Sequence, residues 1–199
     1  MPETIDERFT HDVYLLRRKV LKLFGGAFHV FDEAGELLFY SKLKAFRLKE
    51  DIRIWTDESC TAEALIIRAR NVIDFSAAYE VVDPVINQRI GVLRRKGFKS
   101  LLRDEWQVLD ADEQLIGTLK EDSALSALVR RLHDGAALLF PQKYHLTADG
   151  KQVATFKQNF NPFVMKVTAD FSEDTDLQLD RRLGIAAGLM LCAIEGKQD

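Results

Sequence analysis

The stretch that most constrains the fold lies near the C-terminus. It is an uncharged apolar run, Leu183–Ile194 (LGIAAGLMLCAI). A surface helix carries a single apolar stripe, whereas a helix that is apolar on every side has to be enclosed. As a helix this run is roughly 18 Å long at about 1.5 Å per residue, which is shorter than the roughly 20 residues that a membrane crossing needs. The sequence therefore predicts a helix buried inside its own protein.

The rest of the chain repeats a short pattern that ends in an aspartate. In four consecutive copies the aspartates are Asp32, Asp57, Asp83 and Asp110, spaced by 25, 26 and 27 residues. Apolar segments on both sides of a turn are typical of β-hairpins, and near-constant spacing favours a repeat architecture over a chance β-rich pattern. The strand pairs expected are 28–32 with 37–40, 52–57 with 64–68, 79–83 with 90–93, 106–110 with 115–119, and 144–150 with 153–156, followed by a last copy at 163–170.

Six units of two strands give about twelve strands. An open sheet of that width would leave long unpaired edges, which closure removes. A barrel of this size is too wide for its wall side chains to fill, and the C-terminal helix is the candidate filling. Gly184 and Gly188, four residues apart, would let its backbone approach the wall. The sequence thus predicts a mainly β protein: a closed antiparallel barrel of about twelve strands built from repeated hairpins around a hydrophobic helix at 183–195.

Two segments lie outside this repeat. Asp122-Ser123 precede apolar residues at helical spacing, and Asp134-Gly135 follow them, which predicts one short surface helix near 123–133. The first residues are polar and lack the apolar core of a signal peptide. We therefore expect a cytoplasmic protein with a single domain over residues 1–199, of which residues 1–9 form a flexible leader.

The sequence resembles a known family over about residues 10–196. The repeated hairpins, the segments LLRDEWQVLD and QLIGTLKED, and the terminal DRRLGIAAGLMLCAIE are similar to those of the tubby C-terminal-like superfamily. The most similar branches are the phospholipid-scramblase-related and LURP-one-related proteins. The resemblance implies a twelve-stranded barrel wrapped around a central C-terminal helix.

For activity, the resemblance implies divided expectations. Tubby proteins bind phosphoinositides through basic residues on the barrel surface, scramblases are associated with calcium-dependent lipid movement, and the LURP-one-related group has no assigned chemistry. This chain lacks the proline-rich leader and the cysteine-rich palmitoylation run of the scramblases. It also lacks a helix long enough to cross a bilayer.

Composition and motifs exclude several function classes. A net charge of −3 gives no overall attraction for nucleic acid, so no nucleic-acid partner is expected. Two cysteines are too few for a disulfide scaffold or a zinc site. The glycine-rich phosphate loops, the zinc-protease motif and the serine-hydrolase motif are all missing from the sequence. We therefore expect a protein that is not an enzyme, although residues assembled from different loops cannot be recognised in this way.

The densest positive patch is expected in the loop between the third and fourth units. Several cations with an exposed aromatic suit a lipid headgroup or another phosphate. Because Asp104 and Glu105 follow at once, an ordinary solvated turn is the alternative. A second basic group lies at residues 17–22. The candidate ligand-binding residues are Arg94, Arg95, Lys96, Lys99 and Arg103.

An acidic segment between residues 170 and 180 offers oxygen ligands of the kind that calcium prefers. It lies where the scramblases have their proposed calcium segment, but it lacks the residue order of an EF-hand. The candidate metal ligands are Asp170, Asp174 and Asp176. The alternative is a solvated connector, in which case no cofactor is expected.

These observations lead to three hypotheses. The first is a non-catalytic cytoplasmic barrel that binds an anionic ligand such as a phospholipid headgroup, with peripheral membrane contact. The second is a calcium-responsive scramblase-like protein. The third is a small enzyme with a pocket at one end of the barrel.

Overall fold

The structure is a computed structural model that describes residues 5–21, 25–43, 51–70, 77–96, 105–122, 142–159 and 164–195. A 3-10 helix, η1 (Glu7–Phe9), precedes the strands, and helix α2 (Arg181–Glu195) follows them. The strands are β1 (Val13–Leu21), β2 (Gly25–Phe31), β3 (Leu37–Leu43), β4 (Ile52–Trp55), β5 (Glu63–Ala69), β6 (Ala78–Asp83), β7 (Gln88–Arg95), β8 (Glu105–Leu109), β9 (Leu115–Glu121), β10 (Lys143–Ala148), β11 (Lys151–Asn159) and β12 (Met165–Asp170).

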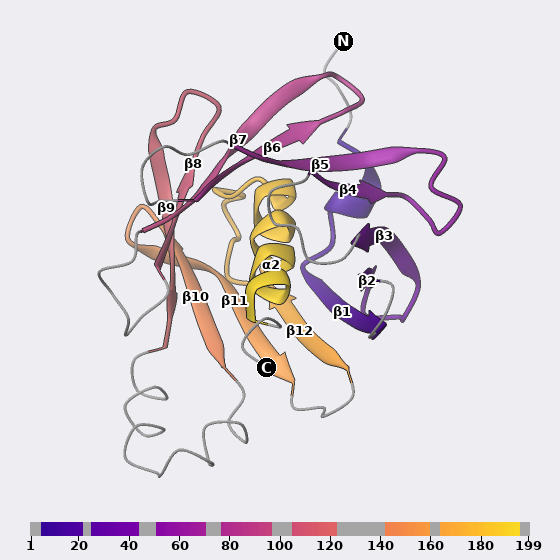
Figure 1. Cartoon of the computed structure of the whole chain (residues 1–199). Coiled ribbons are helices and arrows are strands. Elements are labelled where there is room, and N and C mark those ends of the chain that lie inside the picture. Colours follow the sequence, from indigo (N-terminus) through magenta and orange to yellow (C-terminus); the bar gives the residue numbers. More distant parts are fainter. Residues whose placement is uncertain are drawn as a thin grey trace.

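The twelve strands form a closed antiparallel barrel (Figure 1). Each strand pairs with its neighbours in sequence, and β1 closes the ring by pairing with β12, from Val13 opposite Asp170 to Arg18 opposite Met165. The strand that completes the last hairpin unit is therefore the first strand of the chain. This confirms the predicted closed barrel of hairpins.

Helix α2 lies in the lumen of this barrel and is apolar on every side (Figure 1). Leu183, Ile185, Leu189 and Cys192 are all at most 1% exposed. The helix begins two residues before the predicted start, because Asp180 caps it: its carboxylate accepts the N–H of Arg182 at 2.9 Å. Within the part of the chain that the structure describes, no helix has the length and hydropathy that a membrane crossing requires.

The strand pairing places all the described hairpin turns at one end of the barrel. This is the end where α2 begins, because the Arg182 guanidinium near the start of the helix donates to Asp83, at the end of β6, at 2.7 Å. A second ion pair at the same end joins Arg181 to Asp174 at 2.6 Å. The start of the helix is thus bound both to a hairpin turn and to the connector before it.

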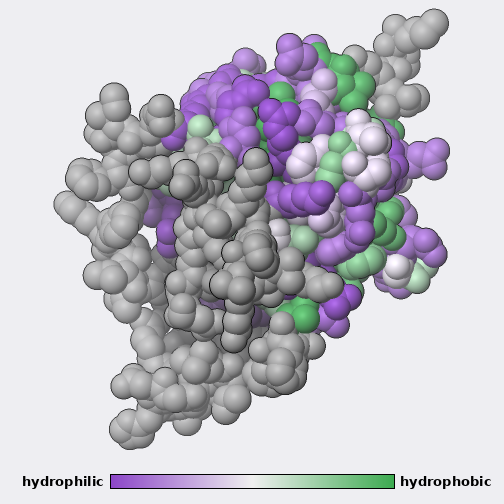
Figure 2. Space-filling view, turned by 45° about the vertical axis from the view of Figure 1, so that its right-hand side comes forward, coloured by the Kyte–Doolittle hydropathy of each residue, from purple (hydrophilic) through white to green (hydrophobic). Residues whose placement is uncertain are grey.

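Side chains alternate between the lumen and the outer surface along each strand, as the pleat of a strand requires. In β1, Tyr14, Leu16 and Arg18 are buried, whereas Arg17 is exposed. In β2, Phe28 and Val30 are buried. Figure 2 shows mainly hydrophilic residues over the described part of the face in view.

Two expectations about segments outside the repeat have different outcomes. In the described part of the leader, η1 places Phe9 at 4% exposure, with its ring stacked on Phe39 at 4.6 Å, whereas Ile5 is 55% exposed. Burial of an aromatic ring holds this part of residues 1–9 on the barrel. The surface helix expected near 123–133 lies outside the described residues.

Candidate functional site

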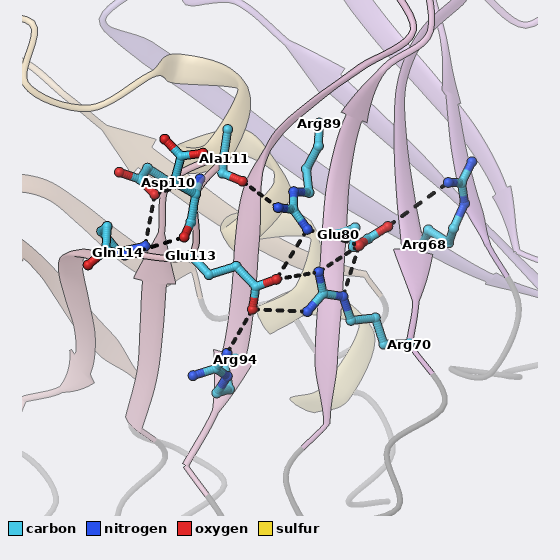
Figure 3. A network of polar contacts seen from close by, with 10 residues as sticks. Arg68, Arg70, Glu80, Arg89, Arg94, Asp110, Ala111, Glu113 and Gln114 are labelled. Carbon is cyan, nitrogen blue, oxygen red and sulfur yellow. Dashed lines mark hydrogen bonds and ion pairs between the residues drawn. The ribbon is translucent and has the colours of Figure 1, made fainter.

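Three arginines from β5 and β7, the two strands that flank β6, gather on the outer face of the barrel (Figure 3). Arg70 follows the last residue of β5, whereas Arg89 and Arg94 lie near the two ends of β7. Their side chains are between 28% and 36% exposed. We call Arg70, Arg89 and Arg94 the arginine cluster.

All three guanidinium groups of the cluster contact the carboxylate of Glu113. Arg70 donates to both carboxylate oxygens, at 2.9 Å and 3.1 Å. Arg89 donates to Oε1 at 3.2 Å, and Arg94 donates to Oε2 at 3.2 Å. Bidentate arginine contacts of this kind suit carboxylate and phosphate groups. One anion is therefore bound by three cations that come from two different strands.

A second carboxylate, Glu80 of β6, orients the central arginine. Its Oε1 accepts the Nε–H of Arg70 at 2.9 Å and an Nη2–H at 2.7 Å. It also accepts a longer bond of 3.4 Å from Arg89, and Arg68 of β5 lies 4.0 Å from its other oxygen. Arg70 thus keeps a carboxylate partner of its own whether or not Glu113 is in contact.

Hydrogen bonding and charge favour the ionised form of each of these groups. Hydrogen bonds from Arg70, together with the charges of the cluster, hold the pKa of Glu113 below its usual value. Burial raises the pKa of Glu80, but hydrogen bonds and charge from Arg70 and Arg89 outweigh that effect and lower it. The same bond with Glu113 raises the pKa of Arg70. Both glutamates are therefore ionised at neutral pH.

The turn between β8 and β9 presents Glu113 to the cluster. Asp110 accepts the N–H of Gln114 on its carboxylate at 2.8 Å, and the carbonyl of Asp110 accepts the N–H of Glu113 at 3.1 Å. Glu113 itself has a φ of 63°. That left-handed conformation costs a residue with a side chain roughly 1 kcal/mol or more.

A second hairpin turn has the same pattern of hydrogen bonds, with glycine at the position that corresponds to Glu113. In the turn between β2 and β3, Asp32 accepts the N–H of Glu36 on its carboxylate at 2.8 Å, and its carbonyl accepts the N–H of Gly35 at 3.2 Å. Gly35 has a φ of 86°. Glycine adopts this conformation at no steric cost. The turn at Asp174 has the same two hydrogen bonds with Leu177, whose φ is 51°, so residues with a side chain and glycine both occur at this position.

Small apolar side chains lie on the barrel wall beside these charges. Val92 pairs with Glu80 on one side and with Leu109 on the other, so all three share one row of the sheet. Val92 and Leu109 are at most 2% exposed and form a separate cluster with Ala78, apart from the main core. Because these buried side chains exclude water, ion pairs next to them are stronger than they would be in full contact with solvent.

The structure separates the basic residues that the sequence grouped together. Arg94 belongs to the cluster, but Arg95 alternates to the opposite face of β7, where its charge acts on the buried phenol of Tyr79. Lys96 pairs with Glu105 at 2.8 Å instead. Lys99 and Arg103 lie outside the described residues.

The second basic group is divided in the same way. Arg17 is exposed on the outer face, whereas Arg18 is fully buried and donates to the backbone carbonyl of Cys192, at 2.9 Å, in the last turns of α2. A cation is favourable at that end of a helix because of the helix dipole. A role in stabilising the helix end thus explains Arg18.

The three candidate metal ligands have different partners in the structure. Asp174 is buried and pairs with Arg181, Asp170 accepts the N–H and the hydroxyl of Ser172, and Asp176 pairs with Lys151 at the surface. The described residues contain no group of three His, Cys, Asp or Glu side chains placed to hold a metal ion. Calcium binding stays a prediction.

Sequence reasoning missed most of the cluster. Of its three arginines, only Arg94 is among the candidate ligand-binding residues, and the sequence pattern singles out none of Arg70, Arg89, Glu80 and Glu113 as a binding residue. Glu80 and Arg68 are directly opposite each other in the β5–β6 register. Outward positions of adjacent hairpins with opposite charges are the signal that could have found these residues, once the strand register was known.

Comparisons with known proteins give a fold likeness. No family model matches the chain, and no curated protein matches it. Among solved structures, the X-ray structure of a protein from Arabidopsis thaliana has a TM-score of 0.53 and 13% sequence identity, with 100% of both chains covered. The likeness extends the barrel architecture to a second protein over its whole length.

Proposed function

We propose that this barrel is a non-catalytic binding module whose arginine cluster takes a phosphate-bearing anionic ligand. The observation that carries the proposal is the convergence of Arg70, Arg89 and Arg94 on the two oxygens of one carboxylate. A phosphate group presents oxygens of the same charge and hydrogen-bonding capacity to a guanidinium.

The surroundings of the cluster support this assignment. Among the described residues, the three arginines of the cluster form ion pairs with two carboxylates, Glu80 and Glu113, so the cations outnumber the anions. Their side chains are partly exposed, so a ligand can reach them from solvent. Ionic contacts at such a site weaken as salt is added.

We also propose that the chain belongs to the tubby C-terminal-like superfamily and works in the cytoplasm. The closed barrel around a C-terminal helix supports the family assignment, because it is the architecture that the resemblance implies. A phospholipid headgroup at a membrane surface is then one source of the phosphate, and a free phosphate ester is the other.

The experiment compares two phosphate probes and two arginine variants. The probes are inositol trisphosphate, measured by calorimetry, and phosphatidylcholine vesicles that contain phosphatidylinositol bisphosphate, measured by flotation. We expect Arg94→Gln to weaken binding. Arg53→Gln is the matched control, because Arg53 lies on the outer face but pairs with Glu63, away from the cluster. Binding to vesicles alone would identify a membrane ligand, and binding to both probes would identify the phosphate ester itself.

Two results would overturn the proposal. One is equal binding by the Arg94→Gln and Arg53→Gln proteins. The other is failure to bind either probe even when Glu113 is replaced by glutamine.

A further inference from the structure

The carboxylate of Glu113 occupies the place where the cluster would contact a ligand. Among the described residues, its two oxygens accept the hydrogen bond that Arg94 donates within the cluster and two of the four that Arg70 donates. A phosphate that approached the three guanidinium groups would meet Glu113 first. We propose that Glu113 is a built-in competitor, which a phosphate ligand has to displace before it binds. This inference rests on the proposed function.

The turn fixes the direction from which the carboxylate reaches the arginines. Glu113 adopts a positive φ in a turn whose counterpart has Gly35 at the same position. Glycine can therefore replace Glu113 in this turn without a backbone cost.

The cluster is also able to survive the departure of Glu113. Arg70 remains bound to Glu80 through Nε and Nη2, and Arg89 still donates to the backbone carbonyl of Ala111. Glu113 lies in a turn with a side chain that is 34% exposed, so it can move into solvent. Its withdrawal leaves Arg70, Arg89 and Arg94 facing only Glu80, and the net positive charge of the site rises by one unit.

If Glu113 competes with the ligand, removal of its charge should increase the affinity of the arginine cluster for phosphate. Glu113→Gln removes the competing charge but keeps the size of the side chain, so we expect tighter binding of inositol trisphosphate, by about fivefold, which corresponds to the loss of one exposed ion pair. Glu113→Gly removes the carboxylate and relaxes the backbone, so it should bind at least as tightly.

Asp112→Asn is the matched control. Asp112 lies in the same turn and is exposed, and among the described residues no ion pair of its side chain is found. This variant therefore removes the same charge without vacating the cluster. An equal gain of affinity in Asp112→Asn and Glu113→Gln would mean that general electrostatics, rather than displacement, sets the affinity.

The remaining outcomes separate the two proposals. If the wild-type protein binds inositol trisphosphate and Glu113→Gln binds it no more tightly, Glu113 acts only as a clamp between the turn and β7. The competitor role is then wrong, and the proposed function stands. If neither protein binds inositol trisphosphate or the vesicles, both proposals fail.

Discussion

Gly184 of helix α2 packs directly against the ring of Phe171, the residue that follows β12. A Cβ atom at this position would come within 2.4 Å of the Phe171 ring, which contacts Tyr14 and Phe156 edge-on and so has little room to move. At Gly188 the nearest atom is the end of the Leu16 side chain at 3.0 Å. The two glycines therefore differ in how much of the core an added methyl group disturbs.

We expect Gly184→Ala to lower the free energy of unfolding by roughly 1–3 kcal/mol through overpacking. The gain in helix propensity, about 1 kcal/mol, offsets part of this cost. Gly188→Ala has the same gain and a smaller clash, so it serves as the control. Denaturation by urea measures both. Equal stability of the two variants would contradict the close contact at Phe171.

Asp174 is a buried charge with a specific set of partners. Its carboxylate lies 2.6 Å from Arg181 and also accepts the N–H groups of Gln178 and Leu179. Removal of one member of a buried ion pair leaves the other uncompensated, which costs about 3–5 kcal/mol. We expect Asp174→Asn to approach that loss of stability, since the amide keeps only one acceptor oxygen.

Asp176→Asn provides the comparison for this prediction. Asp176 is 61% exposed and pairs with Lys151 at the surface, so its replacement should cost less than about 1 kcal/mol. Thermal unfolding of both variants tests the difference. The same scans with calcium test the metal prediction, because a calcium-dependent rise in Tm that Asp176→Asn abolishes would support it.

At the scale of the element, the shortest strand pairing in the described barrel is that of β3 with β4. It has one register pair, Tyr40 opposite Trp55, whereas β4 pairs with β5 through four. A side chain reinforces it: the buried hydroxyl of Ser41 donates to the backbone carbonyl of Arg53 at 2.7 Å. Local opening is expected where strand pairing is short.

Ser41→Ala should therefore increase amide hydrogen exchange over residues 52–55 more than elsewhere. The lost bond leaves a partly buried carbonyl without its donor, at a cost of about 1 kcal/mol. Thr147→Ala is the control. The hydroxyl of Thr147 donates to the backbone carbonyl of Thr118 at 3.3 Å, but this hydrogen bond is exposed to solvent. A uniform change over the whole barrel would argue against local opening.

The helix and the hairpins could be predicted from the sequence, whereas the arginine cluster could not. Leu189 and its neighbours predicted an enclosed helix because no face of it could meet water. The hairpins were predicted because their turn aspartates recur, as at Asp32 and Asp110. The arginine cluster was missed because Arg70 and Glu113 are 43 residues apart, and the side-by-side pairing of β5 to β9 brings them within hydrogen-bonding distance. Proximity in a barrel wall depends on register, which residue type does not encode.

At the scale of the whole molecule, the charges on the outer face link stability to pH. The pKa values of Glu80, Glu113 and Glu105 are all lowered in the folded barrel from a value of 4.5. A carboxyl group with a lowered folded pKa stabilises the fold above its unfolded pKa. That stabilisation is lost as the pH falls through the folded value.

We therefore expect the free energy of unfolding to stay level near neutral pH and to decrease as the pH falls below about 4.5, the unfolded pKa of a glutamate. Arg70→Met removes the cation that lowers the pKa of both Glu80 and Glu113, so it should be less stable at neutral pH and show a shallower decrease in acid. Arg53→Met, which affects a separate ion pair with Glu63, should keep most of the wild-type slope. Urea denaturation across the acid range measures these slopes. Parallel curves for the wild-type protein and Arg70→Met would mean that the arginine cluster does not control the acid sensitivity of the barrel.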